Sequence, residues 1–362
     1  MPERMPRHLQ RLLRRISRSF YLTLRMLPGR IRTQIGLAYL LARATDTIAD
    51  TRLVSAERRL EALRALCGAV VDAAEGRQAH LPGLAASGVD GTAAEGTLLE
   101  SIPELLRVLG ALSRDDRLLI AGVLRTIASG QEMDVERFGS ASGTGIAALR
   151  NAAELDDYIY RVAGCVGEFW TRMCRAHLFG KTGPDDGFLL AAGIRFGKGL
   201  QLVNILRDIA VDLRRGRCYV PLDRLAECGL TPEALLQANS MAGFRPVYDA
   251  CLQEARDHLD AGWAYVNALP KTPARLRLAC AWPILIGVRT IALLRLRNVL
   301  DERERIKIGR GGVWTLMLRS TLSYPIPSIW RRLPEKQRQS SKTLSPAGDQ
   351  FAPRRNRRNC SR

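Results

Sequence analysis

Apolar side chains recur at helical spacing along almost the whole chain. Within residues 57–71, one helical face would carry Leu60, Leu63, Leu66, Cys67, Val70 and Val71. Residues 115–138 and 184–213 show the same period, whereas strand-like alternation is hard to find. Leu, Ala and Arg are abundant and β-branched residues are sparse, which also favours helices. The pattern therefore predicts an all-α protein.

Breaks in the pattern define its organisation. Residues 76–96 are rich in Gly and Ala and residues 142–145 read SGTG, so both predict loops. Apolar helices of similar character resume after each loop, so neither loop is a domain boundary. We expect a basic N-terminal segment at residues 1–16, one folded domain at 17–320 and a basic tail at 331–362. Ser, Arg, Asn and Pro dominate from residue 336 onward, so we expect the tail to be disordered.

The formal net charge of +19 raises the question of a nucleic-acid partner. Most of this charge lies at the two ends: residues 1–20 carry six Arg and one Glu, and residues 331–362 carry ten Lys or Arg against two acidic residues. No zinc-finger, RNP or KH pattern accompanies the charge. We therefore expect no nucleic-acid partner; a solvated tail or contacts with diphosphates or an anionic membrane remain open.

Other features restrict the chemistry and the compartment. The eight cysteines are scattered without a CxxC pair and the four histidines are isolated, so we expect reduced thiols and no histidine-based metal site. The apolar run at residues 278–288 is about half the roughly 20 residues of a membrane span. The N-terminus has no apolar secretion core. These features predict a cytoplasmic protein.

Two aspartate pairs carry the candidate chemistry. Asp46 and Asp50 lie four residues apart in LAYLLARATDTIADT, and Asp208 and Asp212 repeat that spacing in GLQLVNILRDIAVDLRRGRCYVP. On a helix both members of a pair share a face, where like charges repel. Mg²⁺ prefers oxygen ligands, which it commonly shares with substrate phosphates. One DxxxD alone is usually a solvated helix face, but two in apolar helices flanked by arginine predict a cage for metal ions and diphosphate.

Four segments in order resemble the squalene/phytoene synthase family of head-to-head prenyl synthases. They are SRSFYLTLRMLP at 17–28, LLARATDTIAD at 40–50, DDYIYRVAGCVG at 156–167 and LQLVNILRDIAVDLRRGRCYVP at 200–221. The similarity runs from about residue 15 to 315. It implies the isoprenoid synthase fold, a single helical bundle with a central active-site cavity.

The resemblance also implies roles for individual residues. Mg²⁺ would be held by Asp46, Asp50, Asp208 and Asp212. Diphosphate would be contacted by Arg18, Ser19, Arg43, Arg207 and Arg217, with Gln201 and Asn204 in support. The reacting centre would be lined by Phe20, Tyr39 and Tyr158. Tyr39 or Tyr158 would assist proton removal, with released diphosphate as the alternative; all three rings also suit plain core packing.

The implied reaction joins two farnesyl diphosphates through presqualene diphosphate to squalene, with hydride from NADPH. The first motif and RIKIGRGGVWTLML at 305–318 resemble squalene synthases, and Lys307 and Arg310 would meet the NADPH phosphates. The chain departs from the eukaryotic members at Ala279, where they usually carry phenylalanine; Trp282 is the candidate substitute. Termination at presqualene diphosphate, dehydrosqualene or phytoene stays open, as do a non-catalytic assembly factor and a nucleic-acid-binding protein.

A membrane hypothesis accompanies this interpretation. The enzyme would release an oily product, and the helix at residues 11–16 together with the basic tail would hold it at the inner face of a membrane as a peripheral protein. The sequence leaves the oligomeric state open.

Overall fold

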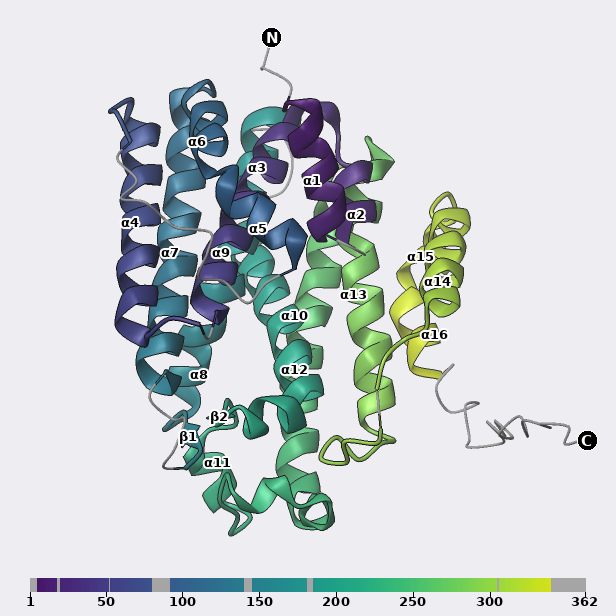
Figure 1. Cartoon of the computed structure of the whole chain (residues 1–362). Coiled ribbons are helices and arrows are strands. Elements are labelled where there is room, and N and C mark those ends of the chain that lie inside the picture. Colours follow the sequence, from purple (N-terminus) through teal and green to yellow (C-terminus); the bar gives the residue numbers. More distant parts are fainter. Residues whose placement is uncertain are drawn as a thin grey trace, which may run out of the picture.

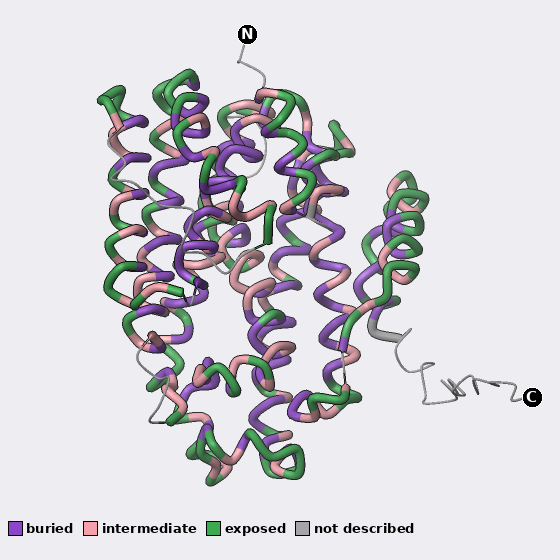
Figure 2. Tube along the Cα trace, in the orientation of Figure 1, coloured by how far each residue is buried: buried purple, intermediate pink, exposed green. Residues whose placement is uncertain are grey.

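The computed structural model describes residues 5–17, 20–51, 53–79, 92–139, 145–180, 185–304 and 306–339. These residues are helical almost throughout, which confirms the all-α prediction. Long helices run side by side as one bundle (Figure 1). Buried positions alternate with exposed positions along these helices, as the helical period of the sequence requires (Figure 2).

The helices of the first half are α1 (Arg7–Ser17), α2 (Phe20–Met26), α3 (Gly29–Asp50), α4 (Ala56–Glu75), α5 (Ala93–Glu100), α6 (Ile102–Gly110), α7 (Arg114–Phe138), α8 (Ala152–Ile159) and α9 (Cys165–Cys174). The second half contains α10 (Asp186–Arg214), α11 (Leu222–Ala226), α12 (Met241–Ala268), α13 (Ala274–Leu294), α14 (Arg310–Ser323), α15 (Pro327–Arg331) and α16 (Leu333–Gln339). Two π-helical turns are η2 (Tyr160–Gly164) and η3 (Arg175–Phe179), and two 3₁₀ turns are η4 (Ala234–Leu236) and η5 (Ala238–Ser240). The strands β1 (Ala147–Ala148) and β2 (Arg217–Cys218) form a short parallel pair.

The long helices begin at side-chain caps. Ser55 accepts a hydrogen bond from the backbone N–H of Arg58 at the start of α4, and Ser113 caps α7 in the same way. Asp185 accepts from the N–H of Phe188 at the start of α10. Such caps satisfy N–H groups that have no partner inside the helix. Each cap fixes the residue at which its helix begins. The position of every later residue along that helix follows from this start.

The bundle is assembled around α10. Helix α10 packs against α9, α12 and α13, while α7 packs against α3 and α4. Helices α9 and α10 approach closely where Gly167 faces Gly193: a Cβ on Gly167 would lie only 1.9 Å from the carbonyl oxygen of Gly193. This glycine contact lets η2, which precedes α9, lie against α10, where the second aspartate pair is located.

The C-terminal region differs from the sequence prediction. The prediction of disorder from residue 331 is wrong for residues 333–339, which form α16 and pack against α13. Trp330 and Leu333 are buried in the core, and the Trp330 indole N–H donates to Asn267 Oδ1 at 3.0 Å. These few apolar anchors outweigh the polar composition around them. Residues 340–362 lie outside the described part of the chain.

Helices α10 and α13 are long and apolar enough to cross a membrane by length and composition alone. Both pack inside the bundle, and 72% of the most apolar stretch of α13 is buried there. Core helices of globular proteins meet the same criterion, so this is weak evidence for a membrane span.

Candidate active site

The two predicted aspartate pairs line one cavity of about 370 Å³. Its walls come from α3, α7, α8, η2, α10 and the segment that follows α10. The lining side chains are those of Arg43, Asp46, Ala49, Asp50, Ile127, Gln131, Asp134, Tyr158, Val162, Gln201, Asn204, Ile205, Asp208, Asp212, Arg215, Arg217 and Tyr219. Residues more than 150 positions apart in the sequence thus meet in one polar chamber.

The first pair lies in the last turns of α3. Gln131 donates from Nε2 to Asp46, and Arg43 Nη1 lies 3.6 Å from Asp46 Oδ2. The Asp46 side chain is 44% exposed, because it opens into the cavity. The protein atoms packed around this carboxylate still remove much of its hydration, so burial raises the pKa of Asp46 to about 6; Arg43 opposes the rise and Asp50 adds to it. Arg43 also forms an ion pair with Glu95 of α5.

The second pair lies in the last turns of α10. Burial and the neighbouring Asp208 raise the pKa of Asp212 to about 7, although Arg217 and Arg215 act against the rise. Arg207 donates from Nε to Asp208 Oδ1 at 2.9 Å. At neutral pH this pair therefore carries less than its full negative charge, and a cation would lower the cost of ionising it.

A fifth carboxylate, Asp134 of α7, was missing from the sequence-based set. Its carboxylate accepts from Arg217 Nη1 at 3.0 Å and from the Tyr219 hydroxyl at 2.7 Å. The Tyr158 ring stacks on Tyr219 with ring centroids 5.0 Å apart. Burial raises the pKa of Asp134 despite these donors. The signal in the sequence is the i,i+3 spacing of Gln131 and Asp134 on one face of α7.

Burial and the nearby Asp134 raise the pKa of Tyr158 well above its ordinary value. Burial does the same to the pKa of Tyr219. Both phenols therefore stay protonated at neutral pH, so they can donate hydrogen bonds but are poor proton acceptors. This favours released diphosphate over Tyr158 as the base.

The turn after α10 positions the arginine and the tyrosine of this network. Gly216 has φ 75°, a left-handed backbone conformation that residues with a Cβ rarely adopt. Its carbonyl accepts from the Ala147 N–H at 3.0 Å, which begins the pairing of β1 with β2. The reversal turns the chain back from α10, so that Arg217 and Tyr219 face Asp134 of α7.

The helix dipoles at this site are unfavourable for negatively charged carboxylates. The pairs on α3 and α10, and Asp134 on α7, all lie near helix C-termini, where the helix dipole is negative. Carboxylate and amide oxygens converge there, and the buried Gln131 Oε1 has no hydrogen-bond partner. These are the donors that Mg²⁺ prefers. Within the described residues no three acidic, His or Cys groups are clustered closely enough to hold an ion alone. Mg²⁺ in proteins commonly shares its coordination with substrate phosphates.

The structure brings together most, but not all, of the predicted site residues. Those in the cavity wall are Arg43, Asp46, Asp50, Tyr158, Gln201, Asn204, Asp208, Asp212 and Arg217. Tyr39 packs against the core on α3, and Arg207 holds Asp208 from outside the wall. Arg18 and Ser19 lie outside the described residues, and so does the side chain of Phe20, which begins α2.

The predicted NADPH residues lie apart from this wall. Lys307 and Arg310 are exposed around the start of α14 and do not line the aspartate cavity. Trp282, the candidate substitute for the missing phenylalanine, is buried next to Ala279 on α13. Its indole N–H donates to Ser320 Oγ of α14 at 3.0 Å, so this ring is held towards α14.

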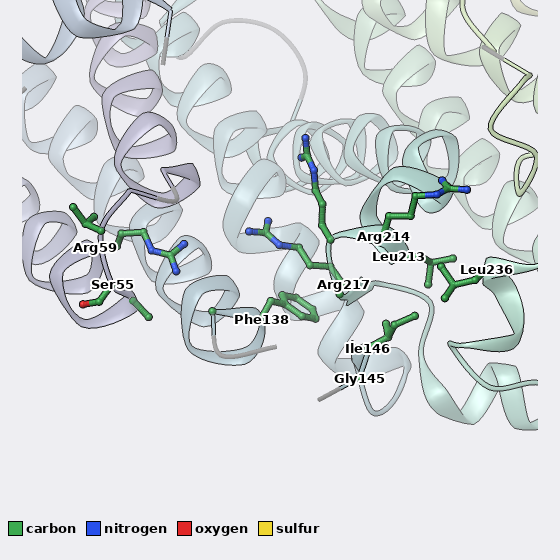
Figure 3. Close-up of a pocket in the computed structure, with 14 residues that line it drawn as sticks. Ser55, Arg59, Phe138, Gly145, Ile146, Leu213, Arg214, Arg217 and Leu236 are labelled. Carbon is green, nitrogen blue, oxygen red and sulfur yellow. The ribbon is translucent and has the colours of Figure 1, made fainter. Parts of the chain in front are cut away.

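A second cavity of about 730 Å³ adjoins the first and shares Arg215 and Arg217 with it. Figure 3 shows Arg59 and Arg217 on either side of Phe138, with Arg214 directed away from them. Arg214 forms an ion pair with Glu302. This basic cavity beside an acidic one would attract anions towards the aspartates.

The sequence of this chain is similar to those of known prenyl synthases. Residues 13–311 match the family described as squalene/phytoene synthase. A bifunctional lycopene cyclase/phytoene synthase of Phaeosphaeria nodorum is 28% identical over 311 residues, covering 83% of this chain and 47% of that protein. Phytoene synthase 2 of Oryza sativa is 34% identical over 155 residues, covering 43% of this chain and 35% of that protein. The chain therefore spans less than half the length of these curated relatives.

Solved structures share the architecture. TcSQS in complex with the ligand BPH1237 superposes with a TM-score of 0.75 at 21% identity, covering 95% of this chain and 93% of that chain. A dehydrosqualene synthase gives 0.63 at 18% identity, with 88% and 95% covered. The squalene synthase HpnC from Alicyclobacillus acidocaldarius gives 0.58 at 20% identity, with 80% and 92% covered. These identities show the fold alone, and they confirm the predicted isoprenoid synthase fold.

Proposed function

This chain belongs to the squalene/phytoene synthase family of head-to-head prenyltransferases, and from that premise we propose that its aspartate cavity joins two allylic prenyl diphosphates. The observation that carries the proposal is the meeting of both aspartate pairs in one cavity together with three arginines. That arrangement suits a reaction whose difficult step is the departure of a diphosphate.

We propose Mg²⁺ as the metal, held by Asp46, Asp50, Asp208 and Asp212. When bound, it would supply positive charge that stabilises the leaving diphosphate. Arg43, Arg215 and Arg217 supply positive charge from the protein around the same cavity. Asn204 and Gln201 add neutral amide groups along α10 that can hydrogen-bond phosphate oxygens.

The proposed first step breaks the C1–O bond of one farnesyl diphosphate, and the bonding electrons leave with the diphosphate. The double bond of the second molecule attacks the resulting C1 cation and forms a carbon–carbon bond. Loss of a proton then closes the cyclopropane of presqualene diphosphate. Tyr158 and Tyr219 present aromatic rings beside the cavity, where they can stabilise a cation. The departed diphosphate accepts the proton, because both phenols are held neutral.

The proposed product is squalene, formed after a second ionisation and hydride transfer from NADPH. The support for this choice is the likeness of the first motif and of residues 305–318 to squalene synthases. Lys307 and Arg310 are the proposed contacts of the NADPH phosphates; they are exposed and so accessible to a nucleotide. The reaction would take place in the cytoplasm, next to the membrane that receives the product.

Phytoene synthesis from two geranylgeranyl diphosphates is the second candidate. Curated relatives named phytoene synthase favour it, as does the absence of Lys307 and Arg310 from the aspartate cavity. Phytoene forms by proton loss after the second ionisation, so this reaction needs no hydride donor. The same aspartates and arginines would serve both reactions.

Product analysis tests the proposal. Purified protein would be incubated with Mg²⁺ and either farnesyl or geranylgeranyl diphosphate, with and without NADPH, and lipid extracts analysed by mass spectrometry. Squalene that requires NADPH is the expected result. Phytoene from geranylgeranyl diphosphate alone would support the second candidate. The absence of any head-to-head product with both substrates would contradict the proposed reaction and favour a non-catalytic role.

A further inference from the structure

Helix α14 is apolar on two sides, and only one of them is buried. Leu316, Met317 and Ser320 face the bundle, where Ser320 accepts the Trp282 hydrogen bond. On another side Trp314 is 60% exposed, Leu318 61% and Leu322 67%. Ile326, four residues further along, is also exposed. We name these four residues the α14 stripe.

The α14 stripe differs from the other exposed apolar residues. Four-residue spacing places Trp314, Leu318 and Leu322 on one face of the helix, so they form a continuous row. The other large exposed apolar side chains of the described chain are dispersed over several elements, for example Leu118 on α7 and Phe188 on α10. Isolated apolar residues are ordinary on protein surfaces, whereas a contiguous row marks an interaction surface.

Charge around the α14 stripe indicates the kind of partner. Residues 306–339 contain seven Lys or Arg and one acidic residue, Glu335. Arg319 of α14 and Arg331 of α15 are exposed close to the stripe in sequence. Helices α14 to α16 lie at one edge of the bundle, beside α13 (Figure 1). A row of Trp and Leu bordered by arginine at an accessible edge is typical of a surface that inserts into the headgroup region of an anionic membrane.

We propose that the α14 stripe docks this protein on an anionic lipid membrane, with α14 lying in the plane of the interface. Its large side chains would enter the acyl boundary while the arginines bind lipid phosphates. Helix α1 does not offer such a surface: Leu9, Leu12 and Leu13 are buried against the bundle. The exposed side chains of α1 are all polar: those of Arg7, His8, Gln10, Arg11, Arg14 and Arg15. The inference does not depend on turnover, although an enzyme releasing a hydrocarbon would benefit from it.

Vesicle flotation tests the proposal with the full-length protein. The stripe variant carries Trp314→Ser, Leu318→Ser and Leu322→Ser; a matched control carries Leu118→Ser, Phe188→Ser and Leu296→Ser at dispersed exposed sites. On phosphatidylcholine vesicles containing phosphatidylglycerol, we expect the stripe variant to bind at least about tenfold more weakly than wild type. We expect the control to stay within about twofold of wild type.

A charge variant and a hydrodynamic measurement complete the test. Arg319→Gln with Arg331→Gln should weaken binding to the anionic vesicles but not to pure phosphatidylcholine. Equal flotation of wild type and the stripe variant, with both folded by circular dichroism, would overturn the proposal. So would a wild-type protein that ignores vesicles and forms a dimer in analytical ultracentrifugation that the stripe variant dissociates. None of these readings requires activity, so a failure here is separate from a failure of the proposed reaction.

Discussion

Two carboxylates of helix α7, one near each end, have opposite surroundings. Asp116, in its first turn, is buried and accepts hydrogen bonds from Gln34 Nε2 at 3.1 Å and from His177 Nε2 at 2.6 Å. Asp134, in its last turns, has Arg217 and Tyr219 as donors, but burial and, to a smaller extent, the nearby Asp50 raise its pKa. The helix dipole favours the first position and opposes the second.

This difference in surroundings distinguishes a carboxylate that stabilises the fold from carboxylates that are suited to bind a ligand. Asp116 has neutral or cationic donors at the favourable end of its helix, so its charge is compensated within the protein. Asp46 and Asp212 occupy the unfavourable ends of α3 and α10, and each has another carboxylate as a neighbour. Perturbed carboxylates that share one cavity are typical of functional sites.

The largest expected effect comes from exchanging Asp46 for asparagine. Asp46→Asn keeps the shape of the side chain but removes one charge from the first pair, so we expect product formation to fall by at least about 100-fold. The matched variant Asp116→Asn should keep the activity of the folded protein within a few-fold of wild type. Rates with Mg²⁺ and allylic diphosphate, scaled to the folded fraction, would decide this. Equal losses in the two variants would remove the distinction between the two ends.

For the stability of the fold we expect the reverse order: a substitution at Asp116 should cost more than one at a carboxylate of the cavity. Asp116→Ala leaves the ring of His177 and the amide of Gln34 without their buried partner, so we expect the free energy of unfolding to fall by about 2–4 kcal/mol. Asp134→Ala should cost less, because it also relieves repulsion with Asp50. Urea denaturation of both variants without Mg²⁺ gives the comparison. A larger loss for Asp134→Ala would mean that Asp134 is mainly a structural residue.

Features that depend on a single helix can be predicted from the sequence. The helical period was enough to predict the bundle, and i,i+4 spacing was enough to place both aspartate pairs. It did not predict the turn η2, because a π turn differs from an α turn by one residue and depends here on contact between α9 and α10. The pair of β1 with β2 is two residues long, too short for an alternating pattern.

The site residues that were missed depend on long-range contacts. Asp134 bonds to residues 83 and 85 positions away, so its partners could not be read from its neighbours in sequence. For Arg207, contact with diphosphate stays a prediction; in the structure it pairs with Asp208, its neighbour in sequence. Composition alone predicts a disordered tail, because it gives no weight to the few apolar side chains that anchor α16.

The pH dependence of activity would sharpen the role of the raised carboxylates. Asp46 and Asp212 must be ionised to bind a cation, and their pKa values in the folded protein are about 6 and about 7. Activity limited by subsaturating Mg²⁺ should therefore rise by roughly tenfold between pH 6 and pH 8, because one pH unit changes the ionised fraction up to tenfold. Saturating Mg²⁺ should move the rise to lower pH. A profile independent of Mg²⁺ concentration would argue against these carboxylates as ligands.

The smallest expected effect is a gain in stability on removing a functional charge. The pKa of Asp212 rises from 3.8 to about 7 on folding, so the folded protein holds a proton that the unfolded chain releases between those values. Raising the pH through this window therefore lowers the stability of the metal-free protein. Asp212→Asn should raise the free energy of unfolding at pH 8 by about 1 kcal/mol, a figure reduced for solvent in the cavity, with no gain at pH 4. Thermal denaturation without Mg²⁺ measures this gain in stability.

Asp115→Asn, in the first turn of α7, should instead lower stability slightly, because a carboxylate is favourable there. A loss of stability in both variants would show that helix position does not distinguish the two kinds of carboxylate.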